Sequence, residues 1–145
     1  MNKLFTIGFT KKNAKQFFNK LKDNNIILLI DIRLNNQSQL AGFTKEDDLK
    51  YFLDVICKIK YIHDTQLSPT KEILDNYKKK IIDWTTYEIF FSELLEKRQI
   101  YTHYSLDILN NACLLCSESE PNFCHRRLVA EYFQKVFKDL AIVHL

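Results

Sequence analysis

The segment between residues 114 and 127 concentrates the side chains of this sequence that can do chemistry. It offers two thiols, a carboxylate, an imidazole and a guanidinium, from Cys116, Glu118, Cys124, His125 and Arg126. Thiolates attack electrophiles or bind metals, imidazole transfers protons, and guanidinium binds anions. Side chains of these types seldom cluster for packing reasons alone, so the segment indicates a place where chemistry or anion binding occurs.

The size and composition indicate one globular domain over residues 1–145. The chain is 46% hydrophobic and 27% charged, with 2 glycines and 2 prolines. Its net charge of +3 tolerates an anionic ligand but falls short of a nucleic-acid-binding footprint. The apolar run Ile26 to Ile30 is too short to cross a bilayer, and no signal-peptide pattern opens the chain. We expect a cytoplasmic protein with no membrane partner and reduced cysteines.

Strand and helix patterns alternate along the chain. Short apolar runs predict strands at residues 4–9, 26–32, 60–63, 112–116 and 141–145. Helical spacing predicts helices at residues 14–22, 45–56, 71–80, 86–98 and 124–137. Asn13, Thr44 and Asn122 stand where N-caps belong. In the helix over residues 86–98, we expect the apolar face to consist of Ile89, Phe90, Leu94 and Leu95. The alternation predicts a Rossmann-like α/β fold: three layers, with helices flanking a mostly parallel sheet.

Polar residues follow the predicted strands, at the edge where parallel sheets bind ligands. They are Gly8 and Thr10, Asp31 and Arg33, His63 and Asp64, and Cys116 and Glu118. If Asn122 caps the last helix, Cys124 lies in its first turn, facing free N–H groups and the positive end of the helix dipole. That position favours an anion and predicts a lowered pKa for the Cys124 thiol.

Several ordered pieces of the sequence resemble one known family. They are Phe5–Gly8, Leu29–Arg33, Gly42–Thr44, Tyr61–His63, Leu114–Glu118 and Cys124–Arg127. Together they resemble the DUF488 family, a domain of unknown function, over nearly the whole chain. The resemblance implies a small prokaryotic α/β protein and no settled reaction.

The chain also departs from that family. Many relatives carry Gly-His-Ser where this chain has Gly8, Phe9 and Thr10. A histidine of the first strand is therefore no obligatory catalyst here. Many relatives also have a proline soon after the segment that corresponds to Asp31–Arg33, where this chain has Leu34, Asn35 and Asn36.

Our preferred hypothesis is a protein that binds or acts on a phosphate-bearing ligand, a nucleotide or nucleic acid, and it leaves open whether the protein is an enzyme. The candidate catalytic residues are Asp31, Glu118 and Cys124. The candidate ligand-binding residues are Gly8, Thr10, Arg33, Cys116, His125 and Arg126. No arginine follows Cys124 at the spacing of a cysteine-phosphatase loop, which argues against a phosphocysteine intermediate. This hypothesis assigns no metal ligand and no cofactor.

Two alternatives stay open. Cys116, Cys124 and His125 are suitable metal ligands or redox thiols, although no C-x-x-C pattern accompanies them. The same cluster fits equally in a non-enzymatic module that binds nucleic acid or protein.

Overall fold

The computed structural model describes residues 1–37 and 41–145, and parallel strands form the middle of the fold. The strands are β1 (Asn2–Gly8), β2 (Leu28–Asp31), β3 (Lys60–His63), β4 (Ala112–Cys116) and β5 (Leu140–His144). They form one sheet in the order β3-β2-β4-β1-β5, and every neighbouring pair is parallel. The predicted α/β fold with a mostly parallel sheet is confirmed.

Helices connect the strands and cover both faces of the sheet. They are α1 (Ala14–Asp23), α2 (Glu46–Phe52), α3 (Lys71–Lys78), α4 (Trp84–Lys97), α5 (Leu106–Leu109) and α6 (His125–Val136). A π-helical turn, Leu53–Cys57, extends α2, and short 3-10 turns lie at Gly42–Thr44, Thr65–Leu67 and Ile100–His103. Within the described residues, none of the helices has the length and apolar character needed to span a bilayer.

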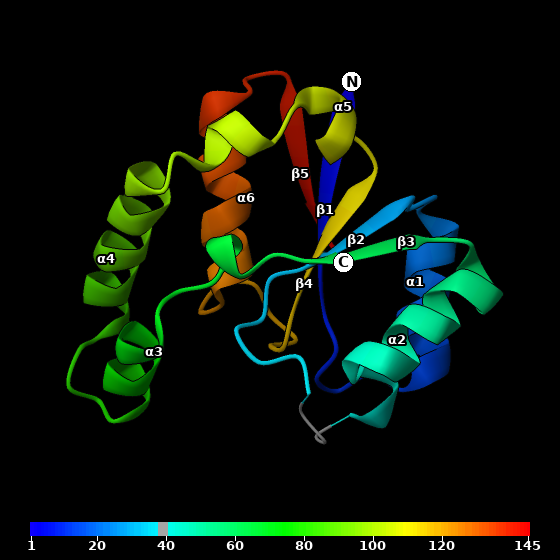
Figure 1. Ribbon diagram of the computed structural model, residues 1–145, viewed down its shortest axis with the longest axis horizontal. Coiled ribbons are helices and arrows are strands. Elements are labelled where there is room, and N and C mark those ends of the chain that lie inside the picture. The colour runs from blue at the N-terminus through cyan, green and yellow to red at the C-terminus, as the bar shows by residue number, and fades with distance from the viewer. Residues whose placement is uncertain (38–40) are drawn as a thin grey trace.

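Alternation along the strands divides the apolar residues between two cores. Cys113 and Leu115 of β4 face the core under α1 and α2, whereas Leu114 and Cys116 face the core under α4 and α6. In Figure 1 the sheet lies between these two groups of helices, with α3 beside α4 and away from α1 and α2. Cys116 therefore emerges on the α4 and α6 side of the sheet.

The register aligns the carboxyl ends of the strands. Gly8 of β1 is paired with Cys116 of β4, and Asp31 of β2 is paired with both Leu115 and His63. The last residues of four strands consequently lie at one edge, as the polar residues after the predicted strands led us to expect.

The Asn13 cap is confirmed, and two other predicted caps are wrong. The Asn13 side chain accepts from the Gln16 N–H, and the Gln16 side chain accepts from the Asn13 N–H, which makes a capping box. Lys45, not Thr44, is the N-cap of α2. The Thr44 hydroxyl instead donates to the carbonyl of Ala41, inside the preceding 3-10 turn.

The predicted apolar face of α4 is partly wrong. Leu95 is buried as expected, but Ile89 is 52% exposed and Phe90 46% exposed. The buried stripe runs through Tyr87, Phe91 and Leu95 at spacings of four residues, because aromatic contacts with Trp84 and His125 fill the space under that side of the helix.

Candidate active site

The core of the candidate site is a contact between Cys116 and His125. Cys116 ends β4, and His125 begins α6, so the thiol and the imidazole come from adjoining elements. The Cys116 Sγ lies 3.4 Å from His125 Nδ1. His125 Nε2 lies 2.7 Å from the carbonyl oxygen of Ile32. Because a carbonyl only accepts, Nε2 carries the proton, and Nδ1 is the unprotonated nitrogen, the nearer of the two to the Cys116 sulfur.

Cys124 joins this pair, although not in the role predicted for it. Cys124 is itself the N-cap of α6, where Asn122 was expected, so it lies just before the first turn. The expectation of a lowered pKa for Cys124 is wrong. Its pKa is raised, because its thiol interacts with that of Cys116 and because it is buried.

The complementary shift occurs at Cys116. The hydrogen bond from Cys124 lowers the pKa of Cys116, and the Ser117 N–H and the positive charge of Arg126 lower it further against the effect of burial. Burial lowers the pKa of His125, so its imidazole is neutral near pH 7. The lowered pKa therefore belongs to Cys116 and not to Cys124.

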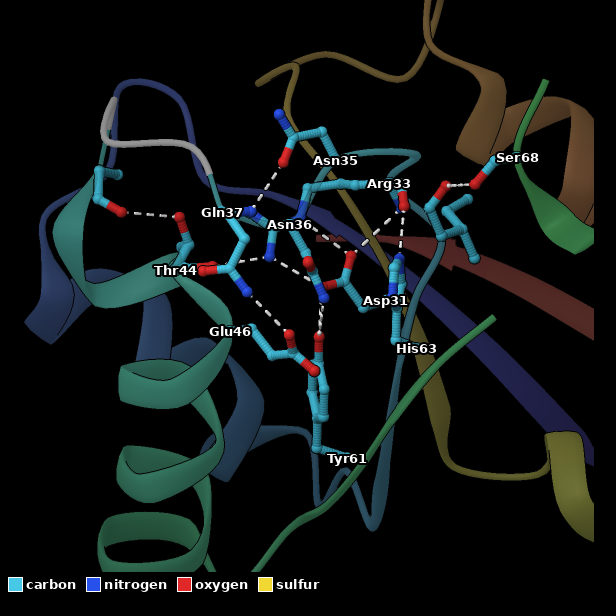
Figure 2. Close-up of polar contacts among 12 residues, drawn as sticks. Asp31, Arg33, Asn35, Asn36, Gln37, Thr44, Glu46, Tyr61, His63 and Ser68 are labelled. Atoms are coloured by element: carbon cyan, nitrogen blue, oxygen red, sulfur yellow. Dashed lines mark hydrogen bonds and ion pairs between the residues drawn. The ribbon is translucent and has the colours of Figure 1, made fainter. Parts of the chain in front are cut away.

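A second group of polar side chains surrounds Asp31, at the end of β2 (Figure 2). Its Oδ1 accepts from Arg33 Nε at 2.9 Å, and its Oδ2 accepts from Arg33 Nη2 at 2.7 Å. The Tyr61 hydroxyl donates to the same Oδ2 at 2.6 Å. Arg33 Nη2 also donates to the carbonyl of Thr44. Both oxygens of the fully buried Asp31 carboxylate are therefore occupied within the protein.

One terminal nitrogen of Arg33, with its two N–H groups, has no partner among the described residues. Burial disfavours its charge, but the hydrogen bond and the charge of Asp31 outweigh this and raise the pKa of Arg33. Its side chain is 3% exposed, and its guanidinium carbon lies 5.5 Å from the ring centre of Phe9. Among the described residues, Arg33 Nη1 is buried without a hydrogen-bond acceptor. A buried, unmatched N–H group is costly, so this donor favours an acceptor from outside the chain.

These two groups meet in one cavity of about 570 Å³, which we call the aromatic cavity. Arg33, Cys116, Cys124 and His125 contribute its reactive part. Its opposite wall comes from the α3–α4 hairpin and the segment before α6, through Tyr77, Trp84, Tyr87 and Phe123. Trp84 and Tyr87 stack at 4.6 Å between ring centres, and Phe123 meets Trp84 edge-on. A thiol, an imidazole and a guanidinium thus line the same cavity as this cluster of rings, which we call the aromatic wall.

Arg126 lies behind the segment that follows β4, not in the aromatic cavity. Its side chain is fully buried. Its guanidinium donates to the Thr6 hydroxyl and to the carbonyls of Glu118 and Ser119. The sequence suggested an anion as its partner, whereas the structure supplies uncharged oxygen atoms of the protein.

Gly8 and Thr10 also contact this segment. The Thr10 N–H and hydroxyl both donate to the carbonyl of Ser117, at 3.0 and 2.7 Å. A Cβ on Gly8 would overlap the carbonyl of Glu118 and come within 2.6 Å of Arg126 Nη1. Glycine is needed here for close approach, because only a residue without a side chain leaves room for the segment.

The structure therefore divides the predicted site residues into three groups. Arg33, Cys116, Glu118, Cys124 and His125 line the aromatic cavity, where Glu118 is exposed at the rim. Asp31 is paired with Arg33, and Gly8, Thr10 and Arg126 hold the segment after β4. Sequence reasoning missed the aromatic wall and Tyr61. The closely spaced aromatic residues Tyr77, Trp84 and Tyr87 were the available signal for this wall.

The fold and the site define a class: an α/β protein with a parallel sheet and a thiol–imidazole pair in a cavity at its carboxyl edge. The family model described as domain of unknown function DUF488 matches residues 13–133. The chain belongs to the DUF488 family. Comparison with curated proteins and with solved structures gave no match.

The close approach at Gly8 predicts a large difference between the two glycines of the chain. We expect Gly8→Ala to lower the free energy of unfolding by roughly 3 kcal/mol or more, because the backbone of the segment must move. Gly42→Ala is the matched control, since its Cβ would meet no atom of the described residues within 4 Å. Urea denaturation of both variants measures the difference, and equal losses would contradict the prediction.

The pKa shifts predict which cysteine reacts first. With a chelator present at pH 7, we expect iodoacetamide to modify Cys116 about ten-fold or more faster than Cys57, because the thiolate is the attacking form. Cys57 is the more exposed of the two, but burial raises its pKa, whereas that of Cys116 is lowered. Mass spectrometry after timed quenching measures both rates, and labelling in order of exposure would refute the assignment.

The pKa shifts of Cys57 and Cys116 also predict how the rate of labelling of each thiol depends on pH. On lowering the pH from 9 to 6, the labelling rate of Cys57 should fall first and that of Cys116 later, because a lowered pKa preserves the thiolate to lower pH.

Proposed function

We propose that this protein binds a phosphate-bearing ligand with a planar base, as in a nucleotide or a nucleic-acid end, in the aromatic cavity. The observation that carries the proposal is the buried Arg33, whose Nη1 has no acceptor among the described residues and which shares this cavity with the aromatic wall. A ligand with an anionic group and a flat ring satisfies both features at once.

The aromatic wall supports the base part of the ligand. Phe123 is 64% exposed and Trp84 is half buried, so both rings present surface to an incoming group. Stacking of a base on an aromatic side chain contributes about 1–3 kcal/mol and tolerates any base. A cavity of about 570 Å³ accommodates a ligand of this size.

Arg33 supports the anionic part. Its pairing with Asp31 fixes the guanidinium plane, so that the remaining donor is pre-oriented before the ligand arrives. Asp31 then acts as a positioning residue, since both its oxygens are already bonded. Phosphate oxygens are strong acceptors for such a donor.

If the bound ligand is also transformed, Cys116 is the candidate nucleophile. Cys124 donates to its sulfur, and His125 Nδ1 faces it to receive a proton. Glu118 at the rim is the candidate acid or base for a leaving group. Gly8, Thr10 and Arg126 support the site indirectly, by holding the segment that carries Glu118.

The exposed ring of Phe123 gives a test that leaves the core intact. Isothermal titration with nucleoside monophosphates should show binding to the wild type, and Phe123→Ala should weaken it roughly 5- to 100-fold through lost stacking. Phe90→Ala is the matched control, because Phe90 is also exposed but lies outside the cavity. Absence of binding across the nucleotide panel, or equal effects of the two variants, would contradict the proposal.

A second function is favoured by one specific observation. The ligand atoms of Cys116, Cys124 and His125 all lie within 4.8 Å of one another. The hydrogen bond from His125 Nε2 to the Ile32 carbonyl is the outer contact that metal-binding histidines typically make. Two sulfurs and one nitrogen suit Zn²⁺ and leave one position for water or a substrate.

Cobalt binding tests this second function. If it holds, Co²⁺ should give thiolate-to-cobalt absorption at one equivalent, and Cys124→Ser should weaken binding by about ten-fold or more. Cys57→Ser should change nothing, since Cys57 is not among the three ligands. Lack of that absorption, or its persistence in Cys124→Ser at wild-type affinity, would exclude a metal centre built from these residues.

A further inference from the structure

A second cavity, of about 600 Å³, lies on the other side of the segment that follows β4. We call it the lysine pocket, because Lys11, Lys12 and Lys20 line it together with Gln16. Ser117 and Glu118 line the aromatic cavity, whereas residues 119–122 line the lysine pocket. One short segment therefore separates two cavities at the carboxyl edge of the sheet.

Two elements bring the basic side chains together. Lys11 and Lys12 belong to the turn between β1 and the Asn13 cap, and Gln16 and Lys20 lie on α1. Gln16 and Lys20 are four residues apart, so they project from the same side of the helix. The capping box fixes the start of α1, and with it the position of the turn relative to the helix.

The positive charge of this pocket is not balanced by ion pairs. Of the salt bridges between described residues, none involves Lys11, Lys12 or Lys20. Glu120 is the acidic side chain that opposes the three lysines in the lining. Burial lowers the pKa of Lys12, and the charges of Lys20 and Arg126 lower it further, which is the effect of like charges held close together.

We propose that the lysine pocket binds a diphosphate or longer phosphate chain. The three ammonium groups are opposed by the Glu120 side chain and by the carboxylate of the last residue, Leu145, and they favour a ligand with several negative charges over a monoanion. Ammonium groups bind phosphate as point charges, and the Gln16 amide NH2 lies in the same lining as a further donor. The charge lines a concave pocket in a chain with a net charge of only +3, which favours a compact ligand over an extended nucleic-acid backbone.

This site goes beyond the proposed function and stands on different residues. The aromatic cavity depends on Arg33 and the rings of Trp84 and Phe123, and none of these lines the lysine pocket. Either cavity can therefore bind its ligand whether or not the other does.

Titration with inorganic diphosphate tests the inference. Isothermal titration at low salt should show binding at one equivalent, and Lys12→Ala and Lys20→Ala should each weaken it about ten-fold, the scale of one lost charge-assisted contact. Lys15→Ala is the matched control, because Lys15 is exposed on α1 and does not line the pocket. Glu120→Gln should strengthen binding, since it removes an opposing carboxylate.

Two further measurements make the result decisive. Thermal melting without ligand should be nearly the same for the wild type and the lysine variants, because no salt bridge is lost. Phe123→Ala should leave diphosphate binding unchanged, which separates this site from the aromatic cavity. Absence of binding, an equal loss in Lys12→Ala and Lys15→Ala, or a loss in Phe123→Ala would each overturn the inference.

Discussion

The burial of the Arg126 guanidinium is the constraint on which the carboxyl edge of the sheet depends. A guanidinium withdrawn from water must have acceptors, because an unmatched buried charge costs several kcal/mol. Its hydrogen bonds in the structure go to the Thr6 hydroxyl and to two carbonyls of the segment after β4. Those carbonyls must point inward, and the segment can approach β1 only because Gly8 has no side chain.

The same charge influences the groups on both sides of that segment. Arg126 lowers the pKa of Cys116, in the aromatic cavity, and the pKa of Lys12, in the lysine pocket. A buried cation acts through a medium of low polarity, so its effect is weakly screened by salt. Arg126 lines neither cavity, yet its charge favours the thiolate form of Cys116 and disfavours the ammonium form of Lys12.

The fold could be predicted from the sequence because the short apolar runs of the strands, the helical spacing of apolar residues and the Asn13 cap are local signals. The sequence did not predict which side of a helix faces the interior of the protein. Nothing local distinguishes Arg126, which is buried, from Arg127, which pairs with Glu88. The predicted place of Cys124 in the first turn was wrong for a similar reason, because the N-cap lies at Cys124, two residues after the expected Asn122.

The pairing of Asp31 with Arg33 limits what the aromatic cavity can bind. Asp31 takes two of the five N–H donors of Arg33 and largely offsets its charge, while Thr44 binds Nη2 as well. What Arg33 offers at Nη1 is therefore a directed hydrogen bond more than a full positive charge. Under the proposed function, selection in this cavity rests on the shape of the acceptor and on the aromatic wall. The lysine pocket, by contrast, offers charge with little fixed direction, because ammonium groups on long flexible stems adapt to their ligand.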